Sequence, residues 1–316
     1  MIGFDQLQLE ADQQKSGVPI AVAGGADRTV LEAVRTATDR GWIRPLVIGN
    51  KAQIRQVAEE CGEDWQKLSI IDSQEPAERA VAEVRSGRAK MIMKGQIATP
   101  ALMRAVLNPV AGLRSARVIC QIVMMEIFPV QRRYLLADTG ICIQPTLDQK
   151  IDILKRAVAL AQALGTAIPK VALLAATESV VETMPETLEA AEICRLHQAA
   201  ALAPCLVHGP LSFDLAYAVQ AGAKKQIQSP VVGAADILLF PNLLAANLTV
   251  KAIMYTANCS FGGILVGAAC PVAFMSRADS TSTRLNSLAL ALKWVTHSDI
   301  QSYGYDKAES YYPKGK

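Results

Sequence analysis

Four side chains suited to acid–base chemistry and anion binding lie within five residues, at Ser276, Arg277, Asp279 and Ser280. They follow a short apolar segment and precede one whose apolar residues have helical spacing, which predicts a strand-to-helix junction. The guanidinium of Arg277 offers a planar pair of donors for a phosphoryl or carboxyl oxygen. Asp279 could take up a proton, and Ser276 could orient a substrate group. The alternative interpretation is that Asp279, Ser280 or Thr281 caps the helix while Arg277 pairs with an acid.

A second polar segment, KGQIATP, places Lys94 and Gly95 directly after an apolar run. Thr99 and Pro100 then supply an N-cap and an N1 proline for a predicted helix. A lysine beside exposed backbone N–H groups at a helix entry is a candidate anion contact. The other interpretation of this residue is a solvent-exposed lysine in a turn.

Three further segments carry polar residues next to predicted strands. In GAADILLFPNLLAANL, Asn242 and Asn247 could bind a ligand carbonyl or hydroxyl group, or only cap the apolar helix that begins there. GGADRT could hold a phosphate on its backbone N–H groups, but it matches neither GxGxxG nor GxxxxGK[ST], which favours an ordinary tight turn. In HGPLSFD, His208 and Asp214 are candidate acid–base residues, although a structural hydrogen bond and a helix cap explain them as well.

Short apolar runs alternate with amphipathic stretches of helix length along the whole chain, which is the pattern of repeated βα units. In the first half this pattern predicts parallel strands with helices on both faces of the sheet. The strands are predicted at 19–23, 45–48, 68–71, 90–93, 170–175, 205–207, 236–240, 263–266 and 272–275, with a second series that starts at 134–138. The helices are predicted at 29–40, 51–61, 76–86, 99–107, 147–164, 186–200, 213–221 and 244–257, with another after residue 280.

The composition narrows the class of protein. A chain of 316 residues predicts two domains, or one with a large insertion, and 51% hydrophobic residues exclude disorder for most of it. The net charge of +3 is spread without a basic run, so we expect no nucleic-acid partner. The N-terminus has no apolar targeting segment and no run is long enough for a membrane span, so we expect a cytoplasmic protein without a membrane partner. Seven scattered cysteines and three scattered histidines predict neither a disulfide framework nor a metal site. The polar tail after Lys293 is expected to be loosely held.

Taken together, the segments resemble the phosphate acetyl/butyryl transferase family, nearest to its phosphate butyryltransferase branch. The resemblance extends from about Ile20 to Lys293. It is carried, in order, by AVAGGADRTVLEAV, PLVIGN, MKGQIATPALMRAVLN, GLRSARVICQIVMMEI, GPLSFDLA, SPVVGAADILLFPNLLAANLTVKAI, GGILVGAACPV and SRADSTSTRLNSLALA.

The resemblance implies an α/β fold with two α/β/α domains of isocitrate/isopropylmalate dehydrogenase type and a cleft between them. The predicted first domain comprises 1–133 and 277–316, and the second comprises 134–276. The implied reaction is reversible transfer of a short acyl group, butyryl or similar, between coenzyme A and inorganic phosphate. Coenzyme A is then a substrate, no other cofactor or metal is expected, and a homo-oligomer, dimer or higher, is expected.

The resemblance also implies roles for single residues. Ser276 and Arg277 match the family's Ser-Arg pair, which implies a hydroxyl near the reacting sulfur and a guanidinium on the phosphoryl group. The acetyl-specific branch has an acidic residue several positions further on, where this sequence has Ser282 and Thr283. Asp279 is therefore the carboxylate expected to act as the base or to orient it.

Lys94, Gly95, Asn242, Asn247 and Ser280 are the expected substrate contacts. The alternatives left open are a phosphate acetyltransferase, a non-catalytic CoA-binding homologue and a metal-dependent hydroxyacid dehydrogenase on the same fold.

Overall fold

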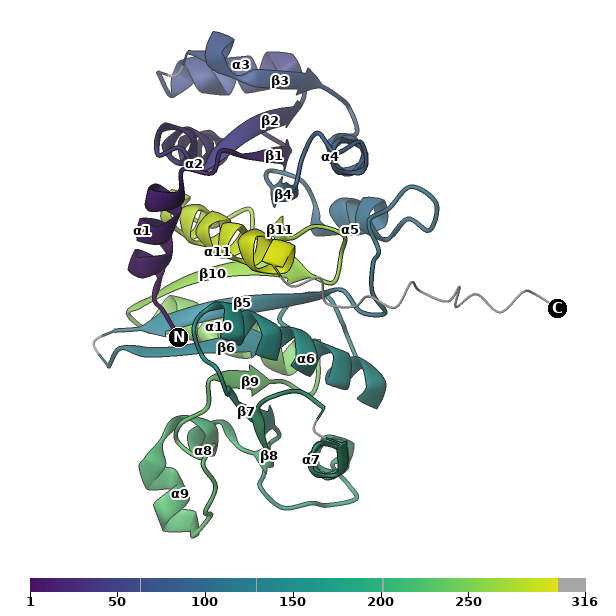
Figure 1. The fold of residues 1–316 in the computed structure, drawn as a ribbon, viewed down its shortest axis with the longest axis vertical. Helices are drawn as coiled ribbons and strands as arrows, with labels where there is room; N and C mark the ends of the chain where they lie inside the picture. Colours follow the sequence, from purple (N-terminus) through teal and green to yellow (C-terminus); the bar gives the residue numbers. More distant parts are fainter. Residues whose placement is uncertain (63, 129, 201, 301–316) are drawn as a thin grey trace, which may run out of the picture.

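The computed structural model describes residues 1–62, 64–128, 130–200 and 202–300. Within these ranges, eleven strands form one mixed sheet with helices on both faces (Figure 1). The predicted α/β class is therefore confirmed. None of the helices described here is long and apolar enough to cross a bilayer.

Most element bounds follow the predicted pattern, but the strand at Cys120–Ile127 was not predicted, and the helix predicted at 213–221 is interrupted at Ala218, whose backbone is extended. The strands are β1 (Val18–Ala23), β2 (Ile43–Gly49), β3 (Ser69–Asp72), β4 (Met91–Lys94), β5 (Cys120–Ile127), β6 (Arg132–Ala137), β7 (Lys170–Leu174), β8 (Leu206–Leu211), β9 (Ile237–Leu239), β10 (Cys259–Val266) and β11 (Val272–Ala273). The helices are α1 (Phe4–Gln14), α2 (Arg28–Asp39), α3 (Lys51–Glu60), α4 (Pro76–Arg85), α5 (Thr99–Leu107), α6 (Leu147–Ala163), α7 (Pro185–Ala200), α8 (Phe213–Tyr217), α9 (Val219–Lys225), α10 (Leu243–Thr256) and α11 (Thr281–Ile300), with a 3₁₀ turn at Trp65–Lys67.

The sheet runs without a break from one end of the molecule to the other, in the order β3-β2-β1-β4-β11-β10-β5-β6-β9-β7-β8. The first-half strands β1 to β4 pair in parallel, as predicted. In the middle, β10 pairs antiparallel with both β11 and β5, and β5 pairs antiparallel with β6. Strands β10 and β11, from the predicted second domain, thus lie between β4 and β5 of the first. The domain boundaries themselves stay a prediction.

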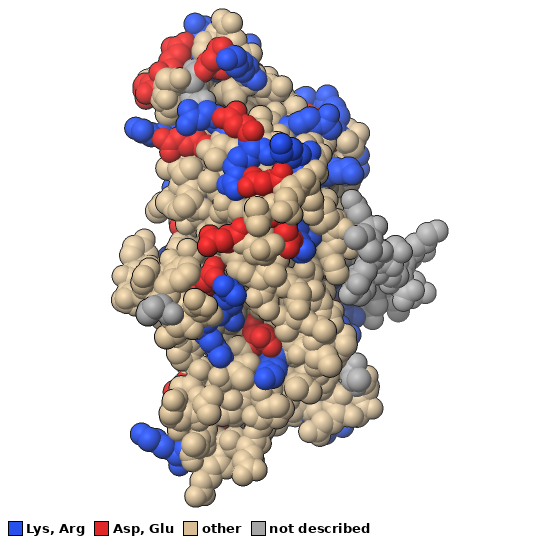
Figure 2. Space-filling view, turned by 60° about the vertical axis from the view of Figure 1, so that its left-hand side comes forward, with Lys and Arg blue, Asp and Glu red and all other residues tan. Residues whose placement is uncertain are grey.

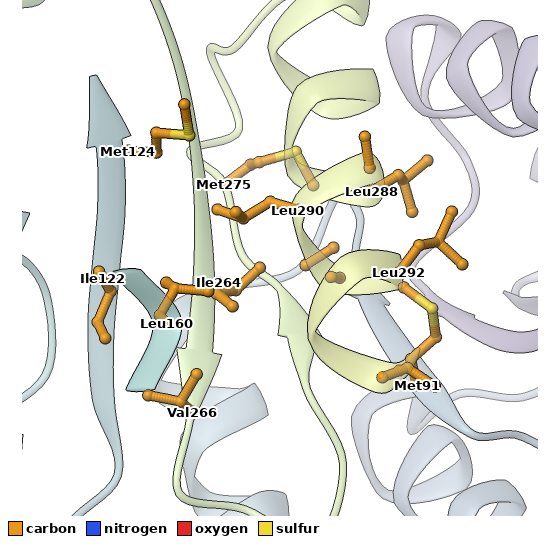
Figure 3. Packing of buried hydrophobic residues seen from close by; sticks show 14 of the residues in the cluster. Met91, Ile122, Met124, Leu160, Ile264, Val266, Met275, Leu288, Leu290 and Leu292 are labelled. Atoms are coloured by element: carbon orange, nitrogen blue, oxygen red, sulfur yellow. The ribbon is translucent and has the colours of Figure 1, made fainter. Parts of the chain in front are cut away.

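One face of the sheet is covered by a single core. Its helices are α1, α2, α3, α6, α7 and α11, and its strand residues include alternate side chains of β5 and β10, such as Ile122 and Ile264. Figure 3 shows Leu290 of α11, together with Met275, packed toward Ile264 of β10. Because α11 is buried along this core and contacts β10 and β11, it fixes the segment that precedes it.

The opposite face carries two separate cores. One packs α4 and α5 against β1, β4 and β11, and it reaches Ile119 and Leu265. The other packs α8 and α10 against β6 and β9, and it reaches Val123. Gln121 of β5 and Gly263 of β10 lie between these cores and belong to neither. The sheet is continuous, but on this face its helical cover is interrupted.

Two terminal segments differ from the prediction or extend beyond what is described. The N-terminal segment forms α1, which was not predicted, and its Phe4 N–H donates to buried Glu126 at 3.2 Å. The helix after residue 280 continues beyond Lys293 to Ile300, because Leu292 and Val295 are buried in the shared core. The remaining tail, 301–316, lies outside the described residues.

Candidate active site

A cavity of about 240 Å³ opens over the interruption between the two cores. It combines the β5–β10 surface, one face of α10, the loop after β6 and the loop that joins β11 to α11. Its walls are formed by Thr99, Gln121, Val123, Thr139, Gly140, Asn247, Val250, Lys251, Met254, Phe261, Gly263, Phe274, Met275, Ser276, Asp279 and Thr283. The pocket therefore draws residues from both predicted domains, as expected for the predicted cleft.

The floor of the pocket is the side-chain amide of Gln121, which has glycine on two sides. A Cβ at Gly140 would collide with Gln121 Oε1, and one at Gly263 would lie 3.3 Å from Gln121 Nε2. Glycine at both positions leaves room for this amide. Among the described residues no side-chain hydrogen bond occupies it, so its donor and acceptor groups remain available to a ligand.

A buried carboxylate holds this floor in place. Asp138 is only 3% exposed, and it accepts backbone N–H groups from Gln121 at 3.1 Å, Gly140 at 2.9 Å and Cys142 at 2.8 Å. Burial raises the pKa of Asp138, whereas these N–H donors oppose the rise. Asp138 thus ties the end of β6 and its following loop to the start of β5.

Helix α10 presents Asn247, Val250, Lys251 and Met254 to the pocket. These positions follow the i, i+3, i+4, i+7 spacing of one helix face. The helix begins at its N-cap, Asn242, whose Oδ1 accepts the Ala245 N–H at 3.0 Å. The structure therefore places Asn247 in the pocket, as expected of a substrate contact, whereas Asn242 is engaged in capping and is not part of the wall.

The loop after β11 brings Ser276 and Asp279 to the opposite wall. Asp279 Oδ2 accepts the Ser276 N–H at 2.8 Å, and Ser276 Oγ accepts the Ala278 N–H at 3.4 Å. Ser280 caps α11 through its Oγ, which accepts the Thr283 N–H at 3.3 Å. Of the three residues that the sequence offered as the helix cap, Ser280 is therefore the one that caps α11. Asp279 does not cap the helix. Arg277 is exposed on the same loop and is not part of the pocket wall.

Two buried cations hold this loop from behind. Lys94 Nζ donates to the Met275 carbonyl at 3.2 Å, and Arg284 Nη2 donates to the next carbonyl, that of Ser276, at 3.4 Å. Lys94 is 2% exposed and Arg284 is fully buried. Arg284 Nε also donates to Thr29 Oγ1 at 2.9 Å, which links the loop to the start of α2. The structure thus places Lys94 against the protein backbone, behind the pocket wall.

The charges in this cluster shift one another's titration. The pKa of Lys94 is lowered to about 8, first by burial and then by the positive charges of Arg284 and Arg277. Burial raises the pKa of Asp279 above its ordinary value, opposed first by the Ser276 N–H and then by nearby cations that include Lys251. Burial also lowers the pKa of Arg284. The four cations of this cluster, Lys94, Lys251, Arg277 and Arg284, outnumber the carboxylates Asp27, Asp138 and Asp279 around them, which suits an anionic ligand.

The remaining predicted segments lie elsewhere or are structural. Gly95 is buried, and a Cβ there would collide with the Gly24 carbonyl, so these two loops pack backbone to backbone. In GGADRT, Asp27 caps α2 by accepting the Val30 N–H at 3.1 Å. His208 lies on β8, the edge strand at the far end of the sheet, and neither it nor Asp214 contributes to the pocket.

The residues that the sequence interpretation missed are Gln121, Lys251, Thr283 and Arg284. For Arg284 a signal was present, because it shares a helical stripe with Leu288 and Val295, and a charge on an apolar stripe is unusual. Lys251 could have been found from its spacing to Asn247. In the described part of the chain, no group of three or more His, Cys, Asp or Glu side chains is arranged to hold a metal ion.

The family model described as Phosphate acetyl/butaryl transferase matches residues 73–292, which include every wall of this pocket. The chain belongs to this family. The matched range also contains Ser276, Arg277 and Asp279, on which the resemblance in the sequence rested.

Relatives of known name cover nearly the whole chain. A phosphate butyryltransferase from Clostridium acetobutylicum is 37% identical over 91% of this chain and 96% of its own length. A phosphate acetyltransferase from Thermotoga maritima is also 37% identical, over 87% of this chain and 94% of its own. The crystal structure of a branched-chain phosphotransacylase from Enterococcus faecalis superposes with a TM-score of 0.77 at 30% identity, covering 89% of this chain and 99% of that one. Because an acetyl- and a butyryltransferase are equally similar, the acyl group must be argued from the pocket.

Proposed function

We propose that this phosphate acyltransferase moves a short-chain acyl group, butyryl or similar, between coenzyme A and inorganic phosphate in the pocket between its two cores. The observation that carries the proposal is the loop of Ser276 and Asp279 on one wall, facing Lys251 and the free amide of Gln121 in the same cavity. This set supplies a carboxylate, a cation and neutral donors around one reacting centre. Coenzyme A is a substrate in this proposal, and no resident cofactor is invoked.

The chemistry assigns a task to each group. In the direction of acyl-phosphate formation, a phosphate oxygen attacks the thioester carbonyl, the tetrahedral intermediate collapses, and the C–S bond breaks to release CoA thiolate. In the reverse direction Asp279 takes the thiol proton, the thiolate attacks the acyl-phosphate carbonyl, and the C–O bond of the tetrahedral intermediate breaks to release inorganic phosphate. In this proposal Lys251 of the pocket wall and Arg277, which is exposed on the adjoining loop, hold the phosphoryl oxygens, and Gln121 Nε2 and Ser276 Oγ donate to the developing oxyanion.

The decisive experiment is a thiol-release assay with acyl-CoA and phosphate. Thiol release that requires phosphate supports the proposed function, and its absence for every acyl-CoA favours a non-catalytic CoA-binding homologue. Appearance of NADH with a hydroxyacid would instead favour the dehydrogenase alternative. In an active enzyme, Arg277→Ala should raise the KM for phosphate by about 10-fold or more, since an Arg–phosphate contact is charge-assisted and often bidentate. An unchanged phosphate KM would remove Arg277 from this role.

We also propose that the protein acts as a homo-oligomer, dimer or higher, in which α10 packs against a second copy. Leu244, Leu248 and Tyr255 form an exposed stripe on this helix, and they are 69%, 61% and 80% exposed. They lie on a different face from the residues that line the pocket. A cytoplasmic location and the absence of nucleic-acid and membrane partners stay predictions. Basic and acidic side chains are intermingled on the face of the molecule that Figure 2 shows.

A further inference from the structure

We infer that the hydroxyl groups of Thr283 and Ser280 form a proton relay between bulk water and the phosphate oxygen at the reacting carbonyl. The inference rests on the proposed function and adds a second proton-transfer path to the same reaction. Asp279 handles the proton on sulfur, whereas Thr283 and Ser280 handle the proton on the phosphate oxygen that attacks or leaves the carbonyl carbon.

Three hydroxyl groups form a hydrogen-bonded chain at the start of α11. Thr283 lines the pocket and is only 7% exposed. Its Oγ1 lies 3.1 Å from Ser280 Oγ, which in turn lies 2.9 Å from Ser282 Oγ. Ser280 and Ser282 are both exposed. The chain of hydroxyl groups therefore leads from the pocket wall to the surface of the protein.

The hydrogen bonds of this chain can run in either direction. Ser280 Oγ accepts the Thr283 N–H at 3.3 Å, so one proton and one lone pair remain for its two hydroxyl neighbours. When Ser280 donates to Thr283, the Thr283 proton is free to point into the pocket. When Thr283 donates to Ser280, its oxygen presents a lone pair to the pocket instead. A proton passes between the pocket and water when the chain changes from one direction to the other.

The position of Thr283 suits the phosphate side of the reaction. Thr283 lies in the first turn of α11, where the positive end of the helix dipole stabilises a polyanion. It shares the cavity with Lys251, which holds the phosphoryl oxygens in the proposed mechanism. Asp279 precedes the helix, and its Oδ2 accepts the Ser276 N–H. The two proton-transfer groups therefore reach the cavity from different points of the same wall.

The reaction needs a proton at the phosphate oxygen. In the direction of acyl-CoA formation the C–O bond breaks, and phosphate would leave as an unstable trianion unless this oxygen gains a proton. Thr283 donates its proton to the oxygen as it takes one from Ser280, which takes one from water. The thiol proton goes to Asp279 and then to water, so the protons balance. In the opposite direction the attacking phosphate loses its proton through Thr283 and Ser280, and protonated Asp279 donates to the departing thiolate.

The test compares two acyl donors, butyryl phosphate and butyryl methyl phosphate, by the consumption of CoA thiol. Methyl phosphate leaves as a dianion, the form that is stable at neutral pH, so its departure does not need the relay. Thr283→Val removes the hydroxyl group at nearly constant size and should lower kcat/KM for butyryl phosphate by about 100-fold. Its kcat/KM for butyryl methyl phosphate should stay close to that of the wild type. Thr283→Ser keeps a hydroxyl group and should keep the wild-type ratio of the two substrates.

Two further variants show whether the effect belongs to the relay. Ser280→Ala interrupts the chain and should shift the substrate ratio in the same direction as Thr283→Val. Thr296→Val is the matched control, because Thr296 is a threonine of the same helix whose hydroxyl donates to the Leu292 and Lys293 carbonyls, away from the pocket. Ratios of kcat/KM are unaffected by the fraction of enzyme that folds, so loss of the Ser280 cap does not obscure the result.

A loss confined to butyryl phosphate in Thr283→Val and Ser280→Ala, and absent from Thr283→Ser and Thr296→Val, supports the inference. Equal losses with both acyl donors in Thr283→Val would overturn it, because they would show that Thr283 only holds the loop in place. Unchanged kinetics of Thr283→Val would overturn it as well. A wild-type protein that consumes no CoA thiol with either donor would contradict the proposed function itself, and that outcome differs from an active enzyme whose substrate ratio is unaltered in the variants.

Discussion

Among single residues, Arg284 has the least ordinary environment. Its guanidinium is fully buried, and Nη1 has no hydrogen-bond partner among the described residues. Asp27 and Asp279 raise its pKa only as distant charges, and they offset the effect of burial in part. A buried cation without an ion pair costs stability. Its two hydrogen bonds instead fix Thr29 and the Ser276 carbonyl, so Arg284 acts as a positioning residue for the active-site loop.

We predict that Arg284→Met lowers kcat/KM by about 100-fold, because a shift of about 1 Å in Ser276 is enough to cost that much. The free energy of unfolding should change by only about 1 kcal/mol, since loss of two charged hydrogen bonds is offset by removal of an unpaired buried charge. Arg284→Lys retains a cationic donor and should recover part of the activity. Steady-state kinetics and urea unfolding of both variants provide the measurement. A large loss of stability with a proportionate loss of activity would show that Arg284 is purely structural.

Asp279 should control the acidic limb of the pH profile. Its pKa is raised by burial, so the carboxylate becomes protonated at a higher pH than a free aspartate does. As the pH falls through that raised pKa, Asp279 can no longer take the thiol proton, and turnover should decline. Asp279→Asn should lower kcat by about 100-fold or more and remove this limb from the profile. The measurement is kcat for thiol consumption from acyl phosphate between pH 4 and 8.

The free energy of unfolding distinguishes the catalytic role of Asp279 from its role in holding the loop through the Ser276 N–H. The folded-state pKa of Asp279 lies above the unfolded value, so its ionisation opposes folding as the pH rises through the folded-state value. Asparagine cannot ionise and still presents an oxygen to the Ser276 N–H. Asp279→Asn should therefore be at least as stable as the wild type at neutral pH. A variant that keeps the acidic limb would exclude Asp279 as the base.

At the scale of elements, α10 shows why a periodic pattern cannot by itself locate a site. Its residues serve three purposes: Asn242 caps the helix, Asn247 and Met254 line the pocket, and Leu248 and Tyr255 are exposed. The sequence predicted the helix and noted both asparagines. The two asparagines have different roles because Asn242 precedes the first turn, where a backbone N–H needs an acceptor. Only contacts from other elements distinguish the remaining faces.

Strand β5 shows a different limit. The sequence predicted no strand between 93 and 134, whereas the structure has the eight-residue strand β5 at the centre of the sheet. It is buried on both faces, so its residues do not alternate as in a half-exposed strand. β5 carries two polar residues: Glu126 binds the N-terminal segment and Arg133, whereas Gln121 lies in the pocket floor. A polar residue in a buried strand is the signal that could have located the floor.

For the whole molecule, the sequence predicted the class, the parallel first half and most elements, because each depends on local periodicity. It also predicted Ser276 and Asp279 as site residues, and both of them line the pocket. It did not predict that β10 and β11 complete the sheet between β4 and β5, because strand order depends on contacts distant in the chain. The pocket follows from that order. It forms where Gly263 and Gln121 separate the two cores on one face, while α11 closes the other face.

The exposed stripe on α10 yields a prediction about the assembled protein. If two copies pack through this helix with two-fold symmetry, each substitution appears twice at the interface, and two introduced charges repel. Leu248→Lys should then weaken association by at least about 10-fold, measured by sedimentation velocity over a range of concentrations. Ile168→Lys is a matched control, since Leu248 and Ile168 are both 61% exposed and Ile168 lies away from α10. Because Val250 and Met254 of the same helix line the pocket, the Leu248→Lys protein should also show altered kcat/KM when dissociated. A wild-type protein that sediments as a monomer at every concentration would exclude this interface.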